Sequence, residues 1–275
     1  MKKNPQQALK HLLIAYNANP PLDEAMACIA IDEDETANFD DILTQLDEIS
    51  EDIHIPDVND IIDSVSRINE HLFSKMGFEG NNNDYHNPDN SLIHKVLERR
   101  TGNPITLSSL YMEVARRLNF EVIGIGFPYH FILRPKNCGS TLFFIDPFQK
   151  GAILLEDDLQ ILLCKYGVKT SLEEATKPNS TRKIIQRMSN NLFFSYRKAK
   201  DNISVLRNLD RLILITPECH DLLRIRSVVL ASMGDIRQAI SSLKEYLQFS
   251  PSITDRAECE QRLELLKQLS SEQTI

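Results

Sequence analysis

Apolar and polar positions alternate along the first part of the chain with the spacing of amphipathic helices. Asn4 and Pro5 suit the cap and the first turn of the first helix. Three more apolar stripes follow, each expected to line the core of a helical bundle: 22–31, 42–49 and 58–68. Beyond a polar, turn-rich segment at 80–89, Asn90 or Ser91 is expected to cap a further helix.

The middle of the chain changes from helical to strand-like spacing. A break at 101–104 precedes an apolar pattern at 105–118, which predicts a mostly buried helix. Four short apolar runs bounded by Pro and Gly then follow: 122–127, 130–134, 142–145 and 151–155. Runs of this length and composition are typical of strands, so we predict a small antiparallel sheet packed against the preceding helix.

The last third of the chain contains an internal repeat. Pro217 and Pro251 lie 34 residues apart, and so do Asp201 and Asp235. A period of 34 with a terminal Pro is the spacing of tetratricopeptide helix pairs. Chance similarity between amphipathic helices is the alternative explanation. We predict two tetratricopeptide-like repeats, one of them degenerate, and a capping helix at 255–269.

Together these patterns predict an α+β protein in three parts. A helical N-terminal region at 1–80 packs on a core at 81–176, and helical repeats occupy 182–275 after a linker at 177–180. With 275 residues, 42% hydrophobic and 25% charged, the chain has the size and composition of about two globular domains. No run approaches the ~20 apolar residues that a membrane span needs, so we expect a cytoplasmic protein without membrane contact.

The charges exclude some partners. The net charge is −8, and no Lys or Arg stands between Lys10 and Arg67. Such an acidic front repels a phosphate backbone, so we expect no nucleic-acid partner. A solvated helical face explains it most simply, and docking on the basic C-terminal part or on a basic partner is the alternative. Arg116 and Arg117 can bind an acidic group, although ion pairs with Glu113, other acids nearby or the acidic front are commoner.

Neither disulfides nor a resident metal are expected. The five cysteines are scattered without a CxxC pair, so most are interpreted as small buried apolar residues. The spacing of His86, His94 and His130 matches no known metal site. We therefore predict no cofactor.

One histidine and one aspartate of the middle region can form a catalytic pair. His130 is expected to begin a strand, and Asp146 ends the next strand. On neighbouring antiparallel strands the carboxylate can orient the imidazole and raise its basicity. The nucleophile of such a site normally stands at a helix N-terminus, and 102–106 opens the buried helix nearby.

Four segments around these residues are similar to a known family: 97–108, 114–118, 126–131 and 144–148. The chain resembles the transglutaminase-like superfamily, and within it the bacterial SirB-type branch, which joins such a domain to tetratricopeptide repeats. The match extends over nearly the whole chain. The resemblance implies a papain-like core whose Cys, His and Asp form a triad in that order.

Carried over to this chain, the resemblance places the triad histidine at His130 and the aspartate at Asp146. The cysteine position falls on Pro104, which has no nucleophile. Cys138, expected in a loop between two strands, needs a rearrangement to replace the thiol. The hydroxyls of Thr106 and Ser108 are weak substitutes, because an alcohol needs a strong base and an oxyanion hole.

The sequence thus favours a pseudoenzyme that works by binding. A remnant cleft is expected at Asn103, Pro104 and Phe127, with Tyr85 in a covering loop. The helical repeats are expected to bind a protein or peptide partner. The alternative is an amide-bond hydrolase or acyltransferase in which His130 and Asp146 activate a hydroxyl or a water. Two further interpretations stay open: a purely structural His–Asp pair, and a middle domain that only scaffolds the repeats.

Overall fold

The computed structural model describes residues 4–136, 142–249 and 252–272. The chain divides into two compact units, Met1–Met188 and Ser189–Ile275. Helix α9 (Thr181–Ala199) runs through the point of division. Because this division does not separate a helical front from a core, the three-part division stays a prediction.

Four helices open the first unit, and they follow the predicted apolar stripes: α1 (Pro5–Tyr16), α2 (Leu22–Glu33), α3 (Phe39–Glu51) and α4 (Ile61–Asn69). Side-chain oxygens cap three of these helices by accepting hydrogen bonds from the free N–H groups of the first turn. The caps are Asn4 for α1, Asn38 for α3 and Asp60 for α4. Local sequence therefore explains where these helices begin.

Some short elements were not predicted by the apolar pattern. Helix α4 continues into a π-helical segment, η1 (Glu70–Lys75). Strands β1 (Glu79–Gly80) and β2 (Thr101–Gly102) form a two-residue parallel pair. Such short elements depend on contacts between distant segments and carry little periodic signal.

The predicted cap of the next helix is wrong. Helix α5 (Ile93–Arg99) begins after Leu92, which has no side-chain cap. Asn90 and Ser91 instead belong to a 3-10 turn, η2 (Pro88–Ser91). Asn90 is fully buried there and its side chain forms hydrogen bonds across the preceding loop.

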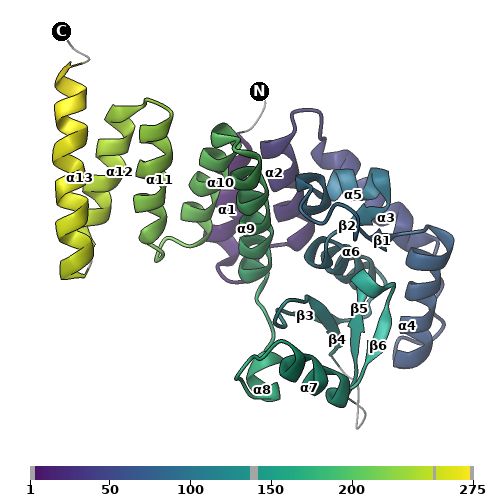
Figure 1. Ribbon diagram of the computed structural model, residues 1–275. Coiled ribbons are helices and arrows are strands. Elements are labelled where there is room, and N and C mark those ends of the chain that lie inside the picture. Colours follow the sequence, from purple (N-terminus) through teal and green to yellow (C-terminus); the bar gives the residue numbers. More distant parts are fainter. Residues whose placement is uncertain (1–3, 137–141, 250–251, 273–275) are drawn as a thin grey trace. The chain divides into compact units, whose positions relative to one another are not determined.

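Helix α6 (Pro104–Arg117) is the buried helix that the sequence predicts (Figure 1). Asn103 caps it, because its Oδ1 accepts a hydrogen bond from the N–H of Thr106. Pro104 occupies the first turn, where its missing N–H costs nothing. The helix packs against α2, α3 and α5, and also against the sheet.

The predicted antiparallel sheet is confirmed, with strands shorter than the apolar runs: β3 (Val122–Ile125), β4 (Ile132–Pro135), β5 (Phe144–Asp146) and β6 (Ala152–Leu154). The strand order is β3-β4-β5-β6, and each strand pairs with the next along the chain. A 3-10 turn, η3 (Pro147–Gln149), follows β5 directly. The prediction that His130 begins a strand is wrong, because His130 lies in the loop before β4.

Two helices follow the sheet, α7 (Glu156–Lys165) and α8 (Leu172–Ala175). Leu159 and Leu163 of α7 pack against buried residues of the sheet, among them Ile125 and Phe144. The predicted linker is part of this unit, because Pro178 forms an isolated β-bridge with Ile125 at the edge of β3.

The second unit contains the end of α9 and four further helices: α10 (Asn202–Ile215), α11 (Asp221–Ser232), α12 (Ile236–Gln248) and α13 (Ile253–Glu272). Turns 34 residues apart have the same local structure. Lys200 and Gly234 both adopt positive φ, 59° and 83°. The following residues, Asp201 and Asp235, cap α10 and α12.

The chain is mostly helical, with a small antiparallel sheet beside α6 and a helical C-terminal region, as the α+β prediction states. Among the described residues, no helix has the length and apolar character that a membrane span requires.

Candidate functional site

The structure brings His130 and Asp146 together. Nδ1 of His130 lies 3.4 Å from Oδ2 of Asp146. Asp146 is nearly inaccessible, with 2% of its surface exposed, whereas 20% of the His130 side chain is exposed. Oδ1 of Asp146 also accepts hydrogen bonds from the N–H groups of Phe148 (3.0 Å) and Gln149 (3.3 Å). Asp146 thus caps η3 with one oxygen and faces the imidazole with the other.

The second ring nitrogen of His130 is also occupied. Nε2 forms a hydrogen bond of 3.2 Å with the hydroxyl of Tyr166, the residue directly after α7. With Asp146 favouring the proton on Nδ1, Nε2 is the acceptor and the Tyr166 hydroxyl is the donor. The Tyr129 ring lies against Tyr166, with 4.7 Å between ring centroids. The imidazole is therefore held between a carboxylate and a phenol.

Two long-range hydrogen bonds hold the backbone of the histidine loop. Nη2 of Arg187, on α9, donates to the carbonyl of His130 over 2.8 Å. Oγ of Ser108, on α6, donates to the carbonyl of Phe131 over 3.1 Å. Tyr129 is the third residue of the turn that begins at Phe127, and its φ of 61° is a left-handed conformation that costs a non-glycine residue energy. Packing on both helices keeps the loop in this shape.

The start of α6 lies beside this loop and is closed to solvent. Pro104 stands one helical turn before Ser108, on the same face of α6, and Ser108 is the residue that contacts the backbone of the histidine loop. Thr106 is fully buried, and its hydroxyl donates to Oδ1 of Asn103 (3.0 Å). Ser108 is also fully buried and has the backbone partner described above. Both hydroxyls are committed to structural hydrogen bonds.

The predicted binding residues are in different environments. Phe127 is fully buried and packs in the apolar cluster under the sheet, so its ring does not face solvent. Tyr85 is 46% exposed, and its ring makes an edge contact with Phe148, two residues after Asp146. Asn103 is buried, with Nδ2 donating to Oγ of Ser91 over 2.7 Å. Of these residues, only Tyr85 has its side chain at an accessible edge of the site.

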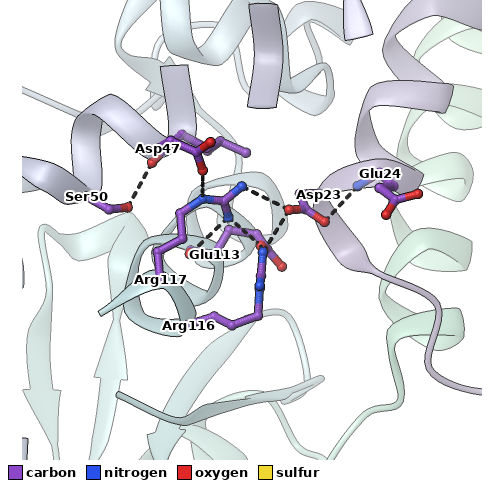
Figure 2. A network of polar contacts seen from close by, with 8 residues as sticks. Asp23, Glu24, Asp47, Ser50, Glu113, Arg116 and Arg117 are labelled. Atoms are coloured by element: carbon purple, nitrogen blue, oxygen red, sulfur yellow. Dashed lines mark hydrogen bonds and ion pairs between the residues drawn. The ribbon is translucent and has the colours of Figure 1, made fainter. Parts of the chain in front are cut away.

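The arginines at the end of α6 form the ion pairs that the sequence analysis weighed. The Arg117 guanidinium contacts Glu113 (2.7 Å), Asp23 (2.9 Å) and Asp47 (2.6 Å). Arg116 contacts Asp23 and Glu113, each at 2.8 Å (Figure 2). Burial, and then the charge of Asp23, raise the pKa of Glu113. Part of the acidic front is thus paired within the first unit.

Within the described parts of the chain, no three His, Cys, Asp or Glu side chains are grouped so as to hold a metal ion. His94 instead pairs with Asp34 at 3.1 Å. Cys28 is buried, and burial raises its pKa to about 11, so its thiol is inert at neutral pH. Cys138 lies outside the described residues.

Sequence reasoning missed two residues of this site, Tyr166 and Arg187. Tyr166 is far from His130 in sequence and belongs to no motif, so no signal marks it. Arg187 offers a weak signal, because it follows the buried Ile184 by three positions and thus lies on the apolar side of its helix. Only its surroundings show that it contacts the histidine loop.

The chain is similar in sequence to several known proteins. A UPF0162 protein of Xylella fastidiosa (strain Temecula1) is 34% identical over 194 residues, which is 68% of each chain. F-box only protein 21 of Mus musculus is 34% identical over 177 residues, 61% of this chain and 28% of that protein. Protein SirB1 of Salmonella typhimurium is 24% identical over 187 residues, 66% of this chain and 67% of SirB1. No solved structure matches the chain.

The family comparison covers the site itself. The model described as the transglutaminase-like superfamily matches residues 40–190, which include α6, the sheet and the loop of His130. On this match the chain belongs to the transglutaminase-like superfamily, and the Xylella relative shows that it also belongs with the UPF0162 proteins.

Proposed function

We propose that this chain is a non-catalytic transglutaminase-like protein, which binds a peptide or small polar ligand beside His130 and a partner through its C-terminal helices. One observation carries the first part. Pro104 stands where the resemblance expects the nucleophile. In addition, the nitrogen of His130 that would take up a proton, Nε2, is already hydrogen-bonded to the Tyr166 hydroxyl. The site keeps an oriented imidazole but offers it no reactive group.

The buried hydroxyls near the site support the same conclusion. Thr106 and Ser108 have no exposed surface, and each donates its proton to an oxygen of the fold. A nucleophilic alcohol must instead give its proton to a base within hydrogen-bond reach. Either hydroxyl would have to break a structural hydrogen bond before it could react.

A hydrolase is the second candidate, and the contact between His130 and Asp146 favours it, because a carboxylate orients the base in such enzymes. Turnover of fluorogenic ester and amide probes separates the candidates. We expect the wild type to be no faster than His130→Ala, and Tyr166→Phe, which frees Nε2, to remain inactive as well. Turnover that depends on His130, especially if Tyr166→Phe raises it, would show an enzyme.

Repeated local structure supports the second part of the proposal. The backbone N–H groups of Asp201 and Asp235 donate to the carbonyls of Tyr196 and Leu230, each over 3.0 Å. Both pairs are 34 residues apart, as expected for tetratricopeptide-like helix pairs. Such stacked pairs present extended surfaces that bind peptides and helices.

A hollow in the second unit is lined by residues of α10, α11 and α12. Its volume is about 210 Å³, and Leu223, His220 and Phe249 are among its lining residues. The rings of His220 and Phe249 are stacked with centroids 3.6 Å apart, and Phe249 remains 46% exposed. An exposed aromatic ring beside a hollow is typical of a docking site for an apolar side chain.

Peptide display against the full chain tests both parts. Selected peptides are measured again with His130→Ala, Phe249→Asp and a matched control, His11→Ala, which changes an exposed histidine of α1. We expect one group of peptides to lose binding with His130→Ala and another with Phe249→Asp, while His11→Ala changes neither. If all selected peptides bind the variants as they bind the wild type, the proposal is wrong.

A further inference from the structure

A half-buried guanidinium lies next to the candidate site. Arg187 of α9 donates from Nη2 to the carbonyl of His130 over 2.8 Å. Its guanidinium lies over the ring of Phe131, 5.5 Å from the centroid. Burial lowers the pKa of Arg187, yet a guanidinium keeps its charge at neutral pH. The positive charge of Arg187 is therefore held against the backbone of His130, the residue whose imidazole the fold orients.

The charge of Arg187 has no counter-charge in the described parts of the chain. Its guanidinium forms no ion pair with a described carboxylate, and its described polar contact is the uncharged carbonyl of His130. By contrast, Arg117 has three carboxylate partners. Burying a charge without a partner is costly, so a site that retains one commonly uses it for a ligand.

The remaining donors of Arg187 are available to such a ligand. Among the described residues, Nη2 makes the one hydrogen bond of this side chain, so Nε and Nη1 have no described acceptor. Neither atom is buried without a partner. Nη1 and the Asn179 side chain both approach the backbone of Gly126, at 2.9 and 2.6 Å from where a Cβ would lie. Because Gly126 has no side chain, the guanidinium of Arg187 and the amide of Asn179 can both approach its backbone.

We propose that Arg187 and Asn179 bind a carboxylate group of the ligand beside the loop of His130. Two N–H groups of a guanidinium match the two oxygens of a carboxylate in one plane. A single guanidinium compensates a single negative charge, which favours a carboxylate over a doubly charged phosphate.

This inference rests on the proposed ligand site at His130 and specifies what that site recognises. A carboxylate can come from the free C-terminus of a peptide or from a small organic acid. The probes are therefore acetyl-trialanine with a free carboxylate, the same peptide as its carboxamide, acetate, and inorganic phosphate. Binding to the full chain is followed by NMR through the side-chain Nε–H signal of Arg187 and the backbone amide signals of Gly126 and Phe131.

We expect the free-carboxylate peptide to shift these signals saturably and the carboxamide to leave them unchanged. Acetate is expected to bind more weakly, because it lacks the peptide contacts. Arg187→Gln is expected to weaken peptide binding about tenfold to a hundredfold, since a hydrogen-bonded ion pair is lost. Arg187→Lys keeps the positive charge but not the planar guanidinium, so its affinity for the peptide should lie between those of the wild type and Arg187→Gln. Lys183→Gln, the matched control, removes an exposed charge one turn earlier on the same helix.

Several results would overturn the inference: equal binding of peptide acid and carboxamide, no saturable shift with any carboxylate, tighter binding of phosphate, or equal effects of Arg187→Gln and Lys183→Gln. The proposed function fails separately. If displayed peptides need His130 but carboxylate binding does not need Arg187, only the inference is wrong. If no selected peptide depends on His130, the ligand site itself is wrong.

Discussion

Two arginine environments in the first unit differ in how their charge is balanced. At the end of α6, Arg116 and Arg117 share two carboxylates, Asp23 and Glu113, and Arg117 also contacts Asp47 (Figure 2). Burial opposes the charge of both arginines, and their hydrogen bonds to acidic partners outweigh it, so both have raised pKa values. This cluster joins α2, α3 and α6 and is complete within the fold.

The environment of Arg187 is the opposite. Burial lowers its pKa, and its described polar contact is the carbonyl of His130, which carries no net charge. The comparison suggests how to separate structural from functional charges in this chain. A buried charge with its full set of partners stabilises the fold, whereas one without a partner beside an oriented imidazole is a candidate for ligand binding.

The largest effect is expected from breaking the balanced cluster. Arg117→Ala removes a buried guanidinium, since the Arg117 side chain is only 11% exposed. The buried carboxylates of Asp23 and Glu113 then keep only Arg116 as a described ion-pair partner. We expect a loss of about 3–5 kcal/mol of unfolding free energy, measured by urea denaturation. Arg116→Ala is the control, since that side chain is 59% exposed and should cost about 1 kcal/mol or less. Equal losses in the two variants would contradict the structural role given to Arg117.

A smaller loss is expected at Asp146. Asp146→Ala removes the cap of η3 and the partner of His130, and should cost about 1–3 kcal/mol. Asp146→Asn keeps an oxygen for the cap but not the charge, so it should retain most of the stability. Thermal and urea unfolding measure both. If Asp146→Asn lost as much as Asp146→Ala, the charge opposite His130, and not the cap, would be the stabilising feature.

Gly126→Ala sharpens the comparison on the ligand side. A Cβ there would lie 2.6 Å from Asn179 and 2.9 Å from Arg187, and both contacts are with the ends of flexible side chains. We therefore expect a modest cost of about 1 kcal/mol, together with loss of carboxylate binding. Adding Asn179→Ala makes room and should recover stability but not full binding. Unchanged binding by the Gly126→Ala variant would show that these two side chains do not form the site.

The smallest effect is expected at His71, a buried histidine whose surroundings favour the neutral form. Burial lowers its pKa, the charges of Lys75 and Arg100 act in the same direction, and Asp52 and Glu70 act against them. Because the unfolded chain protonates first, stability should fall as the pH falls through about 6.5 and level off below the folded-state pKa.

Unfolding of the wild type and His71→Gln between about pH 8 and about pH 5 measures this effect. The variant should lose less stability over that range than the wild type. His11→Gln, which changes an exposed histidine, should behave like the wild type. A wild-type curve parallel to that of His71→Gln would show that His71 titrates alike in both states.

Local elements and the candidate pair, His130 and Asp146, could be predicted without the structure. Asn4 and Asn103 cap the helices that they precede, and the apolar runs between Pro and Gly form the sheet. These features depend on neighbours in the chain, where spacing and capping act directly. His130 and Asp146 could be singled out for the same reason, because each stands near the end of a recognisable strand.

The surroundings of that pair could not be predicted, because they depend on how distant segments pack together. The Tyr166 hydroxyl is hydrogen-bonded to Nε2 of His130, and Ser108 donates a hydrogen bond to the backbone of the loop. Arg187 lies beside the same loop without a described carboxylate partner. Each of these contacts joins residues that are far apart in sequence, and a side chain's partners, burial and charge balance arise only when the chain is packed. Periodicity records which face of an element is buried, but not which atom it meets there.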